Sequence, residues 1–267
     1  MSQILRLNDS SSHHSIVARE TYCRIWWSLY AADAWVSNGL GIDYCIPRLG
    51  EGCDTPMDEA TFRSMTCDQT TYPIARWKPG FWAHLTSLMT LAASIQNFAQ
   101  RALSSYIDRA ETSICIQNLE AKLDRWYEEL GNDLKMSIPN LNRHIRNDLG
   151  RNHVFLHLTY HHYYMTLYFP FLHDQISVQA DSQAYTAKCR DHARSFGDLL
   201  ALSQNMQGCD INYPTVVQMT AISSYVAIHT LLFCEESEIH AARETVNANI
   251  ESLKRFQRSW PLASMIV

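Results

Sequence analysis

Apolar residues recur every three to four positions along most of the chain, which is the spacing of helices that bury one face. The first such segment runs from about Ile16 to Leu40. Its predicted core face consists of Tyr22, Ile25, Trp26, Leu29, Ala32 and Val36. Gly39 and Gly41 supply flexible backbone where this helix is expected to end. The pattern therefore predicts a long amphipathic helix near the start of the chain.

After this helix, prolines and glycines make the segment from Ile42 to Pro79 loop-like, with one short helix expected from about Asp58 to Met65. Helical periodicity then resumes, and "GNDLKMSIPN" is expected to interrupt it. The further helices are expected at about Gly80 to Asp108, Ser113 to Leu130, His153 to Phe169, Ala180 to Asn205, Thr215 to Phe233 and Glu235 to Trp260. Since no alternating strand pattern is found, the prediction is an all-α fold, a single domain of about seven to nine helices.

Composition narrows the class of protein. The 267 residues carry a formal net charge of −5, and no basic stripe is present, so direct DNA binding by this chain is not expected. The eight cysteines are scattered without a C-x-x-C pair, which favours free thiols in a reducing compartment. The polar start does not resemble a secretion signal, and no apolar run approaches the ~20 residues of a membrane span. The interpretation is an intracellular protein without a membrane partner.

Motifs for known chemistries are missing: there is no nucleophile elbow, P-loop, dinucleotide fingerprint or H-E-x-x-H, so no enzyme is predicted. Histidine offers one alternative. His153, His157 and His161 fall four residues apart on one helix face, and two histidines at that spacing can share a zinc ion. This helix contributes no carboxylate or thiolate as a further ligand. The favoured reading is therefore that the imidazoles fill and hydrogen-bond within an aromatic core.

Asp33 is the other unusual position, because it is a carboxylate within an otherwise apolar helix. A carboxylate in such a place needs a partner or caps another segment. Arg24 is too far along the helix to reach it, so the partner must come from elsewhere in the chain. A structural role is favoured over a catalytic base. The many tryptophans and tyrosines are likewise more typical of core than of a small-molecule pocket.

The first helix carries a spaced set of residues: Glu20, Arg24, Trp26, Trp27, Tyr30, Asp33, Ser37 and Gly41. This set resembles the signature of the fungal-specific transcription factor domain, the middle homology region of fungal zinc-cluster regulators. Three later segments are similar to that family in the same order. They are "LHLTYHHYYMTLYFPFL", which contains Pro170, "YTAKCRDHARSF", and "NIESLKRFQRSWPLA", which contains the pair Trp260 and Pro261 near its end.

Several positions depart from the family pattern. Tyr22 and Cys23 stand where two arginines are usual in the family. Ala34 and Phe169 each stand at the position of a further arginine of the pattern. The six-cysteine zinc cluster with which the family reads DNA does not precede the first block. The resemblance thus implies that residues 1–267 are a regulatory domain, N-terminally truncated. Zinc is expected only in the missing DNA-binding module, and no cofactor in this chain.

By the same resemblance, the chain is expected in the nucleus, where it would modulate the transcription of target genes, for example those of a secondary-metabolite or catabolic pathway. Its expected partners are the transcriptional machinery or regulators of the parent type, a small-molecule effector, or a second copy in a homodimer. Three alternatives stay open. They are a ligand-binding module enclosed by aromatic helices, a metal-dependent enzyme that uses the histidine face, and an interaction scaffold.

Overall fold

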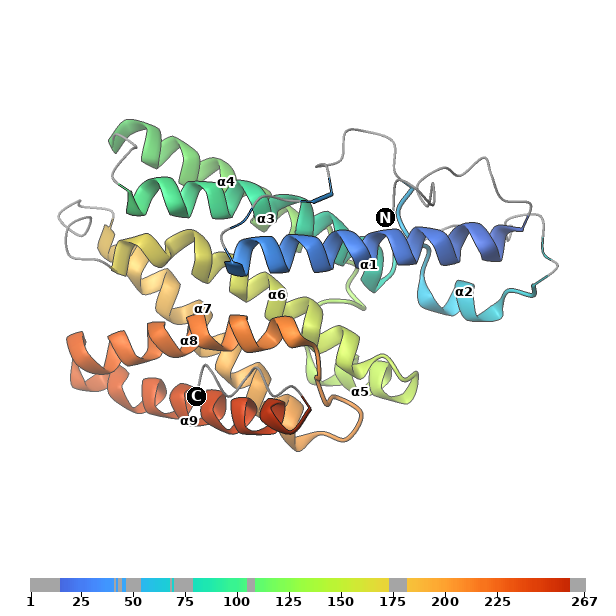
Figure 1. Ribbon diagram of the computed structural model, residues 1–267. Coiled ribbons are helices and arrows are strands. Elements are labelled where there is room, and N and C mark those ends of the chain that lie inside the picture. The colour runs from blue at the N-terminus through green and yellow to red at the C-terminus, as the bar shows by residue number, and fades with distance from the viewer. Residues whose placement is uncertain are drawn as a thin grey trace. The chain divides into compact units, whose positions relative to one another are not determined.

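The computed structural model describes residues 15–40, 42, 45–46, 54–67, 69, 79–104, 109–172 and 182–259. Within these residues there are nine α-helices and one short 3-10 helix, and no strand beyond an isolated bridge between Met57 and Pro79 (Figure 1). This confirms the all-α prediction. The elements are α1 (Ile16–Leu40), α2 (Glu59–Ser64), α3 (Phe81–Leu103), α4 (Arg109–Glu129), α5 (Ile138–Arg146), α6 (Gly150–Tyr168), η2 (Phe169–Leu172), α7 (Ser182–Asn205), α8 (Pro214–Phe233) and α9 (Glu236–Ser259).

The chain divides into two compact units, Met1–Ala93 and Ser94–Val267, where the sequence predicted one domain over residues 1–267. The boundary falls within α3. The first unit holds α1, α2 and the start of α3, and the second holds α4 to α9.

The structure confirms the extent of α1 but corrects the face that it buries. Ile25, Leu29 and Val36, all assigned to the core, are 42%, 39% and 53% exposed. Ala32 is exposed as well. The buried side consists of Trp26, Trp27, Tyr30, Ala31, Ala34 and Ser37. The physical reason is that α1 is apolar on both sides, so a spacing of three and four residues can be followed through either set. The side with two adjacent tryptophans removes more apolar area from water.

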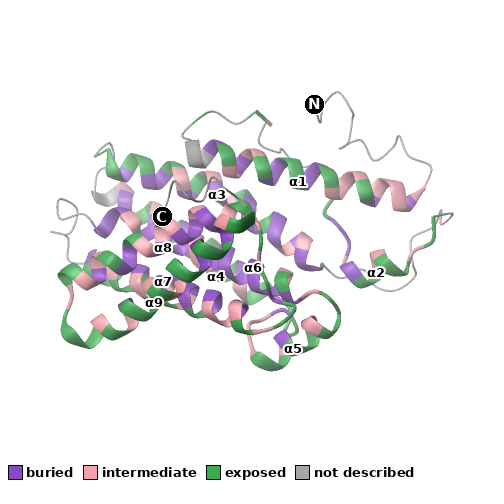
Figure 2. Cartoon of the chain, turned by 60° about the horizontal axis from the view of Figure 1, so that its bottom comes forward, coloured by how far each residue is buried: buried purple, intermediate pink, exposed green. Residues whose placement is uncertain are grey.

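In the second unit, α6 is the central helix, with buried residues along its whole length (Figure 2). It contacts α4, α5, α7 and α8. The helices α7, α8 and α9 pack against one another, and α8 and α9 run side by side (Figure 1). Gly197 lets α7 approach α9 closely, since a Cβ atom at this position would lie 2.9 Å from Cγ2 of Thr245.

The predicted interruption at "GNDLKMSIPN" is confirmed for residues 131–137, which are not helical, but an unpredicted helix, α5, begins at its end. The side chain of Ser137 caps it, because its hydroxyl accepts a hydrogen bond from the Asn140 amide at 3.3 Å. Pro139 occupies the first turn, where its missing N–H costs nothing. The proline was therefore a start signal for a helix and not a break.

Helix α8 bears on the expectation that no segment is long and apolar enough for a membrane span, which is not thereby decided. Its 20 residues include no Asp, Glu, Lys or Arg, and by length and composition it is apolar enough to cross a membrane. It is the one described helix that meets this test, and 44% of its apolar window is buried inside the protein. Serines and threonines break up its apolar runs, which is why a search for continuous apolar sequence missed it.

Candidate functional site

Glu20 and Arg24, one turn apart on α1, form a partly buried ion pair. Nε of Arg24 donates to Oε1 of Glu20 at 2.7 Å, and Glu20 is only 6% exposed. The same carboxylate oxygen accepts the amide of Met57 at 3.0 Å, while the Arg24 guanidinium donates to the Met57 carbonyl at 2.7 Å. Burial raises the pKa of Glu20, and the Arg24 charge opposes that shift. The pair thus binds both the amide and the carbonyl of Met57.

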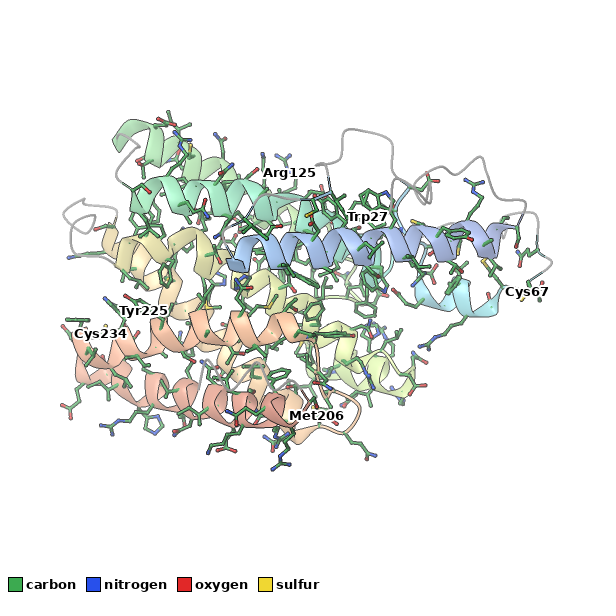
Figure 3. The ribbon with its side chains drawn as sticks, viewed as in Figure 1. Trp27, Cys67, Arg125, Met206, Tyr225 and Cys234 are labelled. Atoms are coloured by element: carbon green, nitrogen blue, oxygen red, sulfur yellow. The ribbon has the colours of Figure 1, made fainter. Side chains whose placement is uncertain are left out.

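Neighbouring residues of the signature extend this attachment. The indole N–H of Trp27 donates to the Asp54 carbonyl at 3.0 Å, and the Cys23 thiol donates to the same oxygen at 3.1 Å. The Arg24 guanidinium also lies 4.4 Å from the ring centre of Phe62 on α2, a cation–π contact. Trp27 can be located in the middle of α1 in Figure 3. These contacts fix the segment 54–62 against α1.

Asp33 has the structural partners that its position required. Its two carboxylate oxygens accept the backbone amides of Cys45 and Ile46, both at 3.0 Å. Thus the carboxylate caps the segment that follows the helix, and a cationic partner is not needed. Of the other signature residues, Ser37 is buried in α1 and Pro170 is buried in η2. Gly41, Trp260 and Pro261 lie outside the described residues.

Of the four histidines of α6, the three that the sequence singled out, His153, His157 and His161, engage different partners. His157 Nε2 donates to the Leu134 carbonyl at 2.9 Å, whereas His161 Nδ1 lies 2.9 Å from Nδ1 of His192 on α7. The ring of His153 packs against His157, with centroids 5.1 Å apart. Burial lowers the pKa of His157 to about 4 and of His153 and His161 to about 3, so all three are neutral at pH 7. Among the described residues, no group of three or more His, Cys, Asp or Glu side chains is arranged to hold a metal ion.

The His161–His192 pair belongs to a polar and aromatic cluster between α4, α6 and α7. The Tyr164 ring stacks on His192 at 4.1 Å, and the Tyr164 hydroxyl donates to Asp124 on α4. Burial raises the pKa of Tyr160 to about 12 and that of Tyr164 further, so both hydroxyls stay protonated at pH 7. The cluster joins three helices through satisfied hydrogen bonds, which is a structural role.

A pocket of about 610 Å³ lies in the second unit, at the end where α8 passes into α9. Cys234 marks this position in Figure 3. The lining comes from η2, the first turns of α7 and α9, and the end of α8. It consists of Phe171, Leu172, Ser182, Gln183, Thr186, Arg190, His229, Phe233, Cys234, Glu235, Ser237 and Glu238. The volume is in the range typical of small-molecule sites, about 300–1,000 Å³.

The lining of this pocket combines apolar and charged residues. Phe171 and Leu172 are almost fully buried, while Phe233 at the end of α8 is 69% exposed. Opposite charges meet where Arg190 Nη1 lies 3.2 Å from Glu238 Oε2. Burial raises the pKa of the Cys234 thiol, so it is protonated at pH 7 and is a poor nucleophile. The arrangement can bind an amphipathic molecule, but it presents no activated nucleophile.

Sequence reasoning did not find this pocket. Its residues come from four elements between Phe171 and Glu238, and no short motif joins them. The available signal was the pair of aromatic residues Phe171 and Phe233, each at the end of an apolar helix.

The fold defines an all-α protein with two compact units and, in the described part of the second, a ligand-sized pocket. No protein-family model, curated protein or solved structure matches the chain.

Proposed function

We propose that this chain is the regulatory domain of a fungal zinc-cluster-type transcription regulator, acts in the nucleus, and modulates the transcription of target genes without catalysing a reaction. The observation that carries the proposal is the spacing of Glu20, Arg24, Trp26, Trp27 and Asp33 on α1. By this proposal, DNA reading and its zinc ions belong to a separate module, and this chain needs no cofactor.

The contacts made by these residues support the proposal. Glu20, Arg24 and Trp27 attach the segment 54–57 to α1, and Asp33 attaches Cys45 and Ile46. A spaced signature in which four members, Glu20, Arg24, Trp27 and Asp33, bind the segments that follow the helix is typical of a fold determinant and not of an active site. Such a signature marks descent from a common fold, which is how it supports membership of the family.

The pocket at the α8–α9 junction supports regulation by a small-molecule effector. Bound ligand would contact η2, α7, α8 and α9 together, so binding would stabilise their mutual packing. The transcriptional machinery or regulators of the parent type are the macromolecular partners in this proposal. A second candidate function, favoured by the same pocket, is a small-molecule-binding protein derived from this domain that has no role in transcription.

The test is a reporter assay in a fungal host, with the full chain fused to a heterologous DNA-binding module and an activation segment. We expect the fused chain to change reporter output several-fold relative to the module alone. Gln183→Trp, which places a large ring at the mouth of the pocket, should alter that output. Gln117→Trp, a matched change at an exposed position of α4, should not. An unchanged reporter, with folded fusion protein present in the nucleus, would exclude the regulatory function.

A further inference from the structure

The charges around the α8–α9 pocket do not balance. Among the residues that the structure describes, its lining contains one guanidinium, Arg190, and two carboxylates, Glu235 and Glu238. Arg190 is already paired with Glu238 at 3.2 Å. Glu235 is exposed and lies at the start of α9, next to the protonated Cys234 thiol. The charged groups therefore leave one negative charge that the lining itself does not compensate.

The two side chains of the Arg190–Glu238 pair also differ in their exposure to solvent. Within the ion pair, the Arg190 side chain is 24% exposed and the Glu238 side chain is 46% exposed. The carboxylate is thus the more accessible member of this ion pair. An anionic ligand would have to approach Arg190 past two like charges, which is unfavourable at the short distances within a pocket.

The aromatic residues of the lining also favour a cationic ligand. Phe233 ends α8 only two residues before Glu235, and its ring is 69% exposed although it borders a pocket. His229 packs on this ring, with centroids 4.8 Å apart, and helps to hold it in place. An exposed aromatic face close to carboxylates is the combination that binds organic cations, while Phe171 and Leu172 provide an apolar surface for the rest of such a molecule.

From these observations we infer that the pocket binds an amphipathic organic cation, a molecule with one amine or quaternary ammonium group and an apolar body. The ammonium group would lie between Glu235, Glu238 and the Phe233 ring, and the apolar body against Phe171 and Leu172. This inference rests on the proposed effector-binding function of the same pocket and specifies the chemical class of the effector.

The test uses three indole compounds of similar size: tryptamine, a cation at pH 7, tryptophol, which is neutral, and indole-3-acetate, an anion. Binding to the purified full chain is measured by calorimetry at low and at moderate salt. We expect tryptamine to bind about fivefold more tightly than tryptophol, the ratio that a half-exposed ion pair gives. Indole-3-acetate should bind most weakly, and added salt should reduce the differences in affinity among the three compounds.

Variants separate the charge effect from general binding. Glu235→Gln combined with Glu238→Gln should remove the preference for tryptamine and leave the affinity for tryptophol unchanged. The affinity for indole-3-acetate should rise, because Arg190 then loses its partner. Glu128→Gln, an exposed change on α4, should have no effect. Equal binding of the three compounds, a preference for the anion, or no binding of any would overturn the inference. The reporter comparison of Gln183→Trp uses none of these compounds, so it decides the proposed function independently.

Discussion

The Arg24 guanidinium lies 2.7 Å from the Glu20 carboxylate, and both groups also hydrogen-bond to the backbone of Met57. The two side chains are 16% and 6% exposed, so the pair is largely removed from water. A pair of this kind costs free energy to bury and is stabilising only while both members are present. The consequence is a strong dependence of each residue on the other.

Replacement of Arg24 by Met tests this dependence. The change leaves the Glu20 carboxylate buried without its cation, and we expect the free energy of unfolding of the first unit to fall by about 3 kcal/mol. The double variant Glu20→Gln with Arg24→Met should regain a large part of that loss, because no buried charge is left unpaired. Urea unfolding followed by tryptophan fluorescence measures both, since Trp26 and Trp27 are buried beside the pair. If the loss in the double variant equals the sum of the losses in Glu20→Gln and Arg24→Met alone, the two residues are not coupled.

Asp33 gives a local prediction. Asp33→Ala removes the acceptor of the Cys45 and Ile46 amides, and a hydrogen bond to a charged group contributes about 1.5–3 kcal/mol. Amide exchange at these two positions should therefore accelerate by at least about tenfold, as measured by NMR. Asp191→Ala on α7, whose side chain is 65% exposed, serves as the control and should leave both rates unchanged. Unchanged exchange in the Asp33 variant would mean that another group holds this segment.

The sequence predicted the extent of α1 and its separation from the loop region, yet it assigned the wrong residues to the core. Periodicity identifies helices well, because it depends only on local spacing. It could not choose between the Ile25–Leu29–Val36 side and the Trp26–Trp27–Tyr30 side, because that choice depends on which side meets the rest of the fold. The role of Asp33 was predictable for a different reason: a carboxylate in an apolar helix must find a partner.

The histidines and the pocket show where local patterns fail. A spacing of four residues placed His157 and His161 on one face, but Leu134 and His192 lie far away in sequence and decide the direction of each hydrogen bond. The pocket likewise exists only because η2, α7, α8 and α9 meet at one end of the second unit. Helix α5 was missed for a simpler reason, since Ser137 and Pro139 form a start signal that was interpreted as a break.

His157 makes stability depend on pH. Its pKa falls from 6.5 to about 4 in the folded chain, mainly because of burial. Below pH 6.5 the unfolded chain therefore binds a proton that the folded chain does not, and stability is lost as the pH falls from 6.5 towards 4. His157→Gln keeps a donor for the Leu134 carbonyl but does not titrate. The stability of the native chain relative to this variant should fall by roughly 3 kcal/mol across that interval in urea unfolding.

The control for this titration is His240→Gln on α9, whose side chain is 85% exposed. Its stability profile should follow that of the native chain at every pH. A constant difference between the native chain and His157→Gln from pH 7 to pH 4 would show that His157 titrates alike in the folded and unfolded chains.

Gly197 is a position at which α7 and α9 approach closely, and it reverses the usual rule for glycine in a helix. Ala is normally favoured there by about 1 kcal/mol. Here a new methyl group would lie 2.9 Å from Cγ2 and 3.2 Å from Cα of Thr245, and the second contact is with backbone that cannot rotate away. We expect Gly197→Ala to lower the free energy of unfolding by about 1–3 kcal/mol in urea unfolding followed by circular dichroism. Thr245→Ser, combined with Gly197→Ala, should restore part of the lost free energy of unfolding, since it removes Cγ2 alone. Gly131→Ala, whose methyl would meet only the movable Asp133 carboxylate, should change stability little, and an equal loss in both variants would contradict the proposed clash.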